Sequence, residues 1–326
     1  MSSKTRNILY GTAVVVLLVL MTLAWVRQGI SVRFRMEKGQ IRLFEKGPNV
    51  PLGEWITAGI DAIGFVKEKT RAMAGSVNYG VRAIKSFLLF FPPLVLTLLL
   101  AGLGWVLTHR LTFSGFTVLG MTLLWGMGVW EASMETLALV SVATVVAVAV
   151  GIPLGILAAL SNVLNHIIMP ILDFMQTLPP FVYLIPAVPF FMLGETAALF
   201  ATVVFAMPPA IRLTALGIQQ VPKELVEAVD AFGSTRMQKL TKLQLPIAAP
   251  SIRAGVNQTL LLALSMAVIA ALVGARGLGG EVWRALQGGK IGPGFEAGIG
   301  IVVLAIVLDR LISAGQGKKK GAAKAA

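Results

Sequence analysis

The sequence contains no cysteine and only two histidines among its 326 residues, so disulfides, thiolate-ligated zinc and cysteine nucleophiles are excluded. Charged residues are also scarce, at 13%, whereas apolar residues make up 56%. So few polar groups cannot cover the surface of a water-soluble globule of this size. Because neither histidine, His109 or His166, has a suitable ligand partner nearby, we expect no metal site and no redox chemistry.

A nucleotide-binding loop is absent as well. The nearest fragment is Gly288-Gly289-Lys290-Ile291, which lacks both the first glycine of the motif and the hydroxyl residue that would hold magnesium. We therefore expect no bound cofactor on this chain and no enzymatic activity. Active transport would then draw its energy from an ion gradient or from another polypeptide.

What the sequence does contain is a series of apolar runs of about 20 residues, the length that a helix needs to cross a bilayer core. The first run follows Lys4 and Arg6 and has the layout of a signal anchor. The sequence therefore predicts an all-α polytopic membrane protein with about eight transmembrane helices, at residues 8–26, 87–107, 112–130, 133–160, 168–192, 196–217, 255–274 and 295–313.

The charges between these runs predict the orientation of the chain. Residues 218–253 form a long polar interruption with five Lys/Arg and three Asp/Glu, and the positive-inside bias places this loop in the cytoplasm. Counting spans from there places both termini and Arg110 inside. It places the polar connector, residues 27–86, outside. The eleven Lys/Arg and five Asp/Glu of this connector would instead favour the cytoplasm. The expected parts are an anchor (1–26), a polar extracytoplasmic connector (27–86), a transmembrane domain (87–314) and a disordered basic tail (315–326).

The formal net charge of +13 is explained by this pattern, since the basic residues lie between apolar runs or at the chain ends. Contact with membrane lipid therefore explains the charge better than binding of nucleic acid.

The cytoplasmic loop has the chemistry of a short capped helix. Pro222 stands at the predicted helix start, Glu224 and Glu227 lie in the first turns, and Gly233 ends the helix in a turn for which we expect a left-handed backbone. A second helical run, residues 234–245, is predicted to close at Pro246. Two short helices joined at a glycine would form a compact knob that docks in a groove of a partner.

The spacing in this loop resembles the signature of the membrane subunits of ATP-binding-cassette (ABC) importers. Glu227-Ala228-Val229 is followed by three residues, Gly233, nine residues and Leu243-x-Leu245-Pro246, with Val229 and Leu243 as the departures from the family pattern. The resemblance implies a type I ABC importer transmembrane domain whose loop inserts a coupling helix into an ATPase subunit, and the residues it assigns to coupling are Pro222, Glu224, Leu225, Glu227, Ala228, Ala231, Gly233, Leu243, Leu245 and Pro246.

Further segments are similar to the glycine betaine/proline betaine (quaternary ammonium) importer permeases of bacterial inner membranes. They are residues 169–181, 207–212, 273–279 and 306–310. The resemblance implies a permease homodimer, a separate ATPase subunit that holds ATP and magnesium, and an external substrate-binding protein. The predicted function is import of glycine betaine, proline betaine or a related solute. Import of another small solute, such as an amino acid or a sulfonate, stays open, and an ion-coupled secondary transporter is the weaker alternative.

Prolines interrupt the predicted span 168–192 and expose backbone carbonyls, which are tolerated at membrane depth only in a protein interior or beside a water-filled path. Asp173, Gln176 and Pro180 would share one helix face. The candidate pathway residues are therefore Asp173, Gln176, Thr177, Pro179, Pro180 and Phe181. An alternative reading makes Asp173 a charge at the cytoplasmic helix end and Gln176 a hydrogen bonder between helices. Several glycines are interpreted as sites of close helix packing, namely Gly151, Gly155, Gly294, Gly298 and Gly300.

Overall fold

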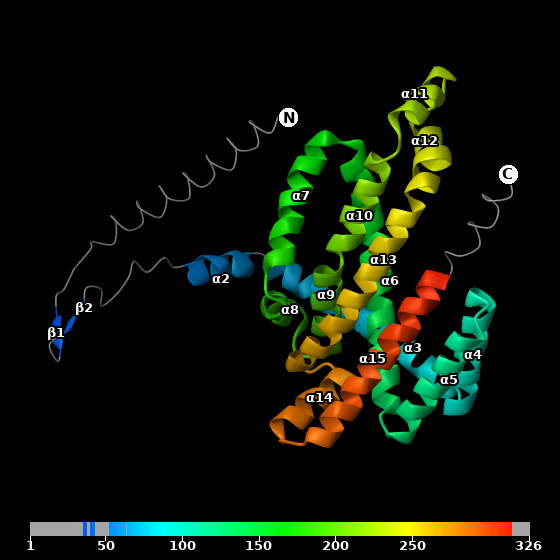
Figure 1. Cartoon of the computed structure of the whole chain (residues 1–326). Helices are drawn as coiled ribbons and strands as arrows, with labels where there is room; N and C mark the ends of the chain where they lie inside the picture. The colour runs from blue at the N-terminus through cyan, green and yellow to red at the C-terminus, as the bar shows by residue number, and fades with distance from the viewer. Residues whose placement is uncertain (1–34, 38–39, 43–51, 63, 315–326) are drawn as a thin grey trace. The chain divides into compact units, whose positions relative to one another are not determined.

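The computed structural model describes residues 35–37, 40–42, 52–62 and 64–314 (Figure 1). The chain divides into two compact units, Met1–Gly64 and Phe65–Ala326. In the first unit, β1 (Arg35–Glu37) pairs antiparallel with β2 (Gln40–Arg42), and helix α2 (Leu52–Ala62) follows. These two three-residue strands are the departure from the predicted all-α architecture within the described residues.

The second unit is a helical bundle. Helix α3 (Gly64–Phe90) continues across the predicted boundary between connector and transmembrane domain at residues 86 and 87. The elements that follow it are α4 (Pro93–Thr108), α5 (Leu111–Gly126), α6 (Trp130–Leu160), α7 (Asn162–Thr177), η1 (Pro180–Tyr183), α8 (Leu184–Phe191), α9 (Glu195–Ala206), α10 (Pro208–Gln219), α11 (Lys223–Ala231), α12 (Arg236–Lys239), η2 (Leu240–Gln244), α13 (Leu245–Ile269), η3 (Ala270–Val273), α14 (Leu278–Gln287) and α15 (Ile291–Ala314).

Within the described residues, four helical segments are long and apolar enough to cross a membrane alone, and two bent pairs bring the number to six. The single segments are Trp130–Leu160, Glu195–Gln219, Arg236–Val273 and Ile291–Ser313. The predicted count of eight is therefore not confirmed. One predicted span, 8–26, lies outside the described residues, and another, 112–130, corresponds to the shorter helix α5.

Proline decides where the two bent pairs break. The segments 78–90 and 93–108 meet at an angle of 100° on either side of Phe91-Pro92, so the prediction of one continuous span over 87–107 is wrong. The predicted break in span 168–192 is confirmed, because α7 ends at Thr177 and the chain turns through 112° before it continues in η1 and α8. A proline has no N–H to donate, and its ring disfavours helical conformation of the residue before it.

The centre of the bundle is a three-helix contact in which α10 lies between α6 and α13. Glycines make this contact close: a Cβ atom on Gly155 would lie 2.6 Å from the Ile211 carbonyl oxygen, and one on Gly255 would lie 3.0 Å from the Pro209 carbonyl oxygen. The predicted close packing is confirmed at Gly155, Gly151 and Gly300. At Gly298 it is wrong, because no atom lies within 4 Å of a Cβ built there.

Successive long segments of the bundle alternate in direction. The ends of α4, α6, α10 and α15 therefore lie on one side, from which α11 and α12 project, and α14 lies on the other side (Figure 1). The side with α11 is the one that the charge pattern predicts to be cytoplasmic.

Candidate functional site

The first candidate site is the projecting pair α11 and α12, here called the knob (residues 222–239). As predicted, α11 begins directly after Pro222, whose carbonyl oxygen accepts the Val226 N–H at 3.3 Å. Glu224 lies in the first turn of α11, where a carboxylate interacts favourably with the positive end of the helix dipole.

Gly233 forms the joint between the two helices. Its φ angle is +75°, the left-handed conformation expected from the sequence. The Gly233 N–H donates to the Asp230 carbonyl oxygen at 2.9 Å, and the Ser234 N–H donates to the Val229 carbonyl oxygen at 3.3 Å. This pair of hydrogen bonds is the Schellman arrangement, which satisfies the last carbonyls of a helix.

Two further interactions fix α12 against α11. Thr235 and Gln238 form a reciprocal capping box at the start of α12. The Lys239 ammonium lies 2.8 Å from both carboxylate oxygens of Asp230, so an ion pair joins the two helices of the knob. Sequence reasoning missed Lys239, because an ion pair across a turn depends on the angle between the helices.

The knob presents an unpartnered apolar surface. No residue of α11 is buried, and the exposed fraction is 93% for Phe232, 67% for Met237 and 43% for Leu225. The other predicted coupling residues on the knob are also exposed, namely Pro222, Glu224, Glu227, Ala228, Ala231 and Gly233. Phe232 was missed by sequence analysis, although an aromatic residue directly before the helix-ending glycine could have identified it.

The remaining predicted coupling residues follow the knob in the chain and are Leu243, Leu245 and Pro246. Leu245 packs against the buried cluster of Ile218, Leu240 and Ala248, and Leu243 is half-buried. The prediction that the second run closes at Pro246 is wrong, because the helix continues through it into α13. The π-helical turn η2 makes this possible: the Leu245 N–H donates to the Leu240 carbonyl oxygen, and the wider turn leaves room for the proline ring.

The second candidate site lies at the break between α7 and α8. Asp173 on α7 forms an ion pair with Arg212 on α10 at 2.5 Å, and the Arg212 Nε is buried without a hydrogen-bond partner in the described part of the chain. Gln176 and Thr177 are exposed. Asp173 therefore has a charge partner 39 residues away, which the sequence pattern did not indicate.

At this break a tyrosine hydroxyl satisfies a backbone carbonyl oxygen that the prolines leave without its usual donor. Pro179 cannot donate to the Met175 carbonyl oxygen four residues before it, and the buried Tyr183 hydroxyl donates to that oxygen instead. The shared face predicted for Asp173, Gln176 and Pro180 is wrong, because α7 ends at Thr177 and Pro180 begins η1 in a new direction. Phe181, at 56% exposed, points away from the core.

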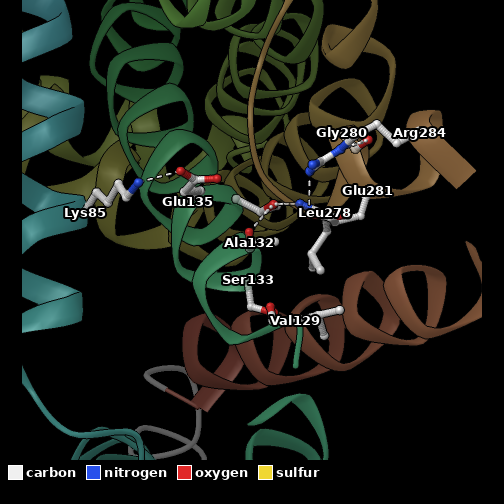
Figure 2. Close-up of polar contacts among 10 residues, drawn as sticks. Lys85, Val129, Ala132, Ser133, Glu135, Leu278, Gly280, Glu281 and Arg284 are labelled. Atoms are coloured by element: carbon white, nitrogen blue, oxygen red, sulfur yellow. Dashed lines mark hydrogen bonds and ion pairs between the residues drawn. The ribbon is translucent and has the colours of Figure 1, made fainter. Parts of the chain in front are cut away.

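A third feature, the glycine turn at residues 273–279, lies at the opposite side of the bundle. Gly277 has a φ angle of +100°, and a Cβ atom there would lie 2.5 Å from Thr136 Oγ1. The same oxygen accepts the Leu278 N–H at 2.8 Å, which joins α14 to α6 (Figure 2). Only glycine satisfies both the left-handed backbone and this close approach.

Beside this turn, a charged cluster joins α3 to α6. The Lys85 ammonium lies 2.5 Å from Glu135 and 3.3 Å from Glu131, and Figure 2 shows Lys85 reaching toward Glu135 across the gap between the helices. Arg82, Glu195 and Arg276 line a small hollow with Lys85 and Glu135. This side of the bundle therefore carries charges of both signs on a compact surface.

Comparison with known proteins places these features in a family. Residues 151–315 match the model of the binding-protein-dependent transport system inner membrane component. The chain is 46% identical to the glycine betaine transport system permease protein OpuAB of Bacillus subtilis over 278 residues, which are 84% of this chain and 97% of that protein. It is 42% identical to the glycine betaine/proline betaine transport system permease protein ProW of Escherichia coli, over 81% of this chain and 75% of that protein.

Among solved structures, the fold resembles an inward-facing conformation of the MetNI methionine ABC transporter. The TM-score is 0.50 at 28% identity, and the match covers 58% of this chain and 93% of that chain. The match therefore covers almost the whole length of that transporter chain.

Proposed function

Since the chain belongs to the family of binding-protein-dependent transport system inner membrane components and is an ABC importer permease of the inner membrane, we propose that its cargo is glycine betaine, proline betaine or a related compatible solute. The observation that carries this proposal is the 46% identity along almost the whole length of a glycine betaine permease. A second cargo class, an amino acid, is supported by the likeness to the methionine transporter.

In this proposal the energy comes from a separate ATPase subunit, which binds ATP and magnesium and receives the knob. The exposed side chains of Leu225 and Phe232 support this role, because an apolar surface on a helix at the cytoplasmic side fits a hydrophobic groove. A substrate-binding protein would dock at the opposite side, near the charged cluster around Lys85 and the turn at residues 273–279.

A homodimer is part of the proposal. α7 leaves Asp173, Gln176 and Thr177 exposed at a proline-broken span, and polar groups at membrane depth require either protein or water beside them. A second copy of the permease facing this surface would enclose a pathway between the two α7 helices.

The contacts of α10 suggest how movement of the knob reaches that pathway. The buried Val221 connects α11 to the end of α10, and α10 fits closely between α6 and α13. Arg212 on α10 pairs with Asp173 on α7. Displacement of the knob by the ATPase would therefore carry α10 with it, and the ion pair would transmit the movement to α7.

Reversal of one charge in this pair is expected to lower uptake about tenfold or more, because like charges would face each other between α7 and α10. Asp173→Arg and Arg212→Asp should each show this loss in a whole-cell uptake assay. The double variant Asp173→Arg with Arg212→Asp should recover most of the uptake, because it restores opposite charges at the same two positions.

The double variant also separates the two roles proposed for Asp173. A residue that contacts cargo directly would not be replaced by arginine, so failure of the double variant to recover uptake, with normal amounts in the membrane, would favour direct contact. Glu296→Gln, at an exposed position near the start of α15 on the opposite side of the bundle, serves as a control for expression.

The cargo itself is tested with the complete complex in proteoliposomes. The permease is purified together with its co-purifying subunits, and the binding protein is added after loading with glycine betaine. We expect ATP hydrolysis to rise on this addition and labelled glycine betaine to accumulate in the vesicles.

Controls with methionine and with a sulfonate distinguish the cargo classes. Accumulation of either, together with none of any quaternary ammonium compound, would overturn the proposed cargo and leave the family assignment unaffected. A preparation without ATP should accumulate nothing above the level set by passive leak.

A further inference from the structure

Helices α5, α14 and α15 enclose an open groove that the transport mechanism does not use. Its volume is about 800 Å³, and its lining includes Phe116, Val282, Val302 and Ile306, with Lys290 at one end. Gly298 is one of the lining residues, and the space beside it is open, because nothing lies within 4 Å of a Cβ built at that position. An apolar groove of this size on a membrane-embedded surface is suited to hydrocarbon.

The groove continues into a second pocket of about 630 Å³ at the end of α15. Phe116 and Ile306 line both, so the apolar part leads directly into the second pocket, whose lining adds Arg110 and Arg310. At a rise of 1.5 Å per residue, Gly298 and Arg310 lie about 18 Å apart along α15. One leaflet of the hydrocarbon core is about 15 Å thick, so the joined groove matches the length of a lipid chain with its headgroup.

The charges at the end of the groove have one sign. No carboxylate lines the second pocket, and Arg110 makes no ion pair with any described residue. Arg310 forms a long ion pair with its neighbour Asp309, with 4.0 Å between Nε and Oδ2, and the other carboxylate oxygen of Asp309 accepts a hydrogen bond from Asn257 on α13 at 2.6 Å. Asp309 itself does not line the pocket. His109 adopts φ of +52° at the end of α4, and this turn places Arg110 before α5.

The two arginines lie on the predicted cytoplasmic side, since Arg110 is in the turn between α4 and α5 and Arg310 is near the end of α15. We propose that this joined groove is a binding site for an anionic phospholipid of the cytoplasmic leaflet. The acyl chains would lie along α15 between Phe116 and Val302, and the phosphate would face Arg110 and Arg310. Basic pockets between helices on this side of a membrane bind anionic headgroups.

Charge argues against the chain's own apolar or terminal segments as occupants. Residues 315–326, which follow α15, carry four lysines and no acidic residue, and the apolar run 8–26 is preceded by Lys4 and Arg6. Either segment would bring further positive charge to a pocket that already holds two arginines. An anionic lipid brings the opposite charge together with the apolar length of the groove.

The test is native mass spectrometry of the complete transporter complex after titration with phosphatidylglycerol or phosphatidylcholine. The wild-type complex should retain phosphatidylglycerol about 30-fold more strongly, the preference expected of two arginines near a headgroup. Arg110→Gln with Arg310→Gln should remove the preference. Gly298→Leu should weaken retention of both lipids, because its side chain would occupy the groove.

Two matched variants control for general effects. Arg276→Gln removes a positive charge on the opposite side, and Gly115→Leu adds the same side chain to α5 where nothing lies within 4 Å of a Cβ. Both should retain lipid as the wild type does. Equal retention of the two lipids by the wild type, or an unchanged preference in the double arginine variant, would overturn the proposal. So would a loss of subunit assembly in Gly298→Leu without any change in lipid, because a protein segment would then fill the groove.

Discussion

Replacement of Phe232 by aspartate is expected to abolish ATP-driven uptake while the permease still folds and inserts. The Phe232 side chain is 93% exposed, so its removal takes almost no packing from the permease itself. If the ring fills a groove on the ATPase subunit, the loss resembles removal of an interface hot spot, which costs about 2 kcal/mol or more. The dissociation constant for the ATPase should rise about 30-fold, measured by titration of the purified ATPase onto the reconstituted permease.

Two control variants test whether the loss of binding depends on the apolar side chain and on its position. Phe232→Leu keeps an apolar side chain at the tip of the knob and should retain most of the binding. Leu193→Asp introduces the same charge at a residue that is 72% exposed on the opposite side of the bundle, and it should leave ATPase binding unchanged. Wild-type affinity in Phe232→Asp would show that the ATPase does not contact this end of the knob.

Replacement of Gly155 by leucine is expected to cause a large loss of stability. A Cβ atom at this position would lie 2.6 Å from the Ile211 carbonyl oxygen and 2.6 Å from Thr214 Cβ, both on α10. Backbone cannot give way as the end of a flexible side chain can, so α6 and α10 would have to separate. Overpacking of this kind costs about 3 kcal/mol, and both the melting temperature in detergent and the uptake rate should fall.

Gly115→Leu is the matched control for this second variant. It makes the same exchange within a helix, but nothing lies within 4 Å of a Cβ at Gly115. The melting temperature of Gly115→Leu should equal or exceed that of the wild type, since leucine favours helix more than glycine does. A melting temperature of Gly155→Leu as high as that of Gly115→Leu would mean that α6 and α10 are not in close contact.

The local features of the knob could be predicted from the sequence alone. The helix start at Pro222 and the left-handed turn at Gly233 depend on interactions among residues within one helical turn, so the residue types carry the information. The break after Thr177 was predictable for the same reason, because a proline lacks an N–H in every environment.

Contacts between residues far apart in the chain could not be predicted from residue types. Arg212 meets Asp173 across 39 residues of chain, and Tyr183 supplies the hydrogen bond that Pro179 cannot make. The residue type of Pro246 predicted a helix end, yet η2 widens the preceding turn and the helix continues. Gly298 resembled Gly155 in the sequence, but the first faces an open groove and the second touches α10.

Hydropathy, charge bias and helix capping are properties of short segments in contact with lipid or water, so the residue types were enough to predict a helical membrane protein with a capped polar loop at residues 218–253. Tertiary structure alone decided which polar groups pair, how sharply the proline-broken spans bend and where a lipid-sized groove remains. These depend on which helix faces meet, and a residue's type does not state the face against which it will pack.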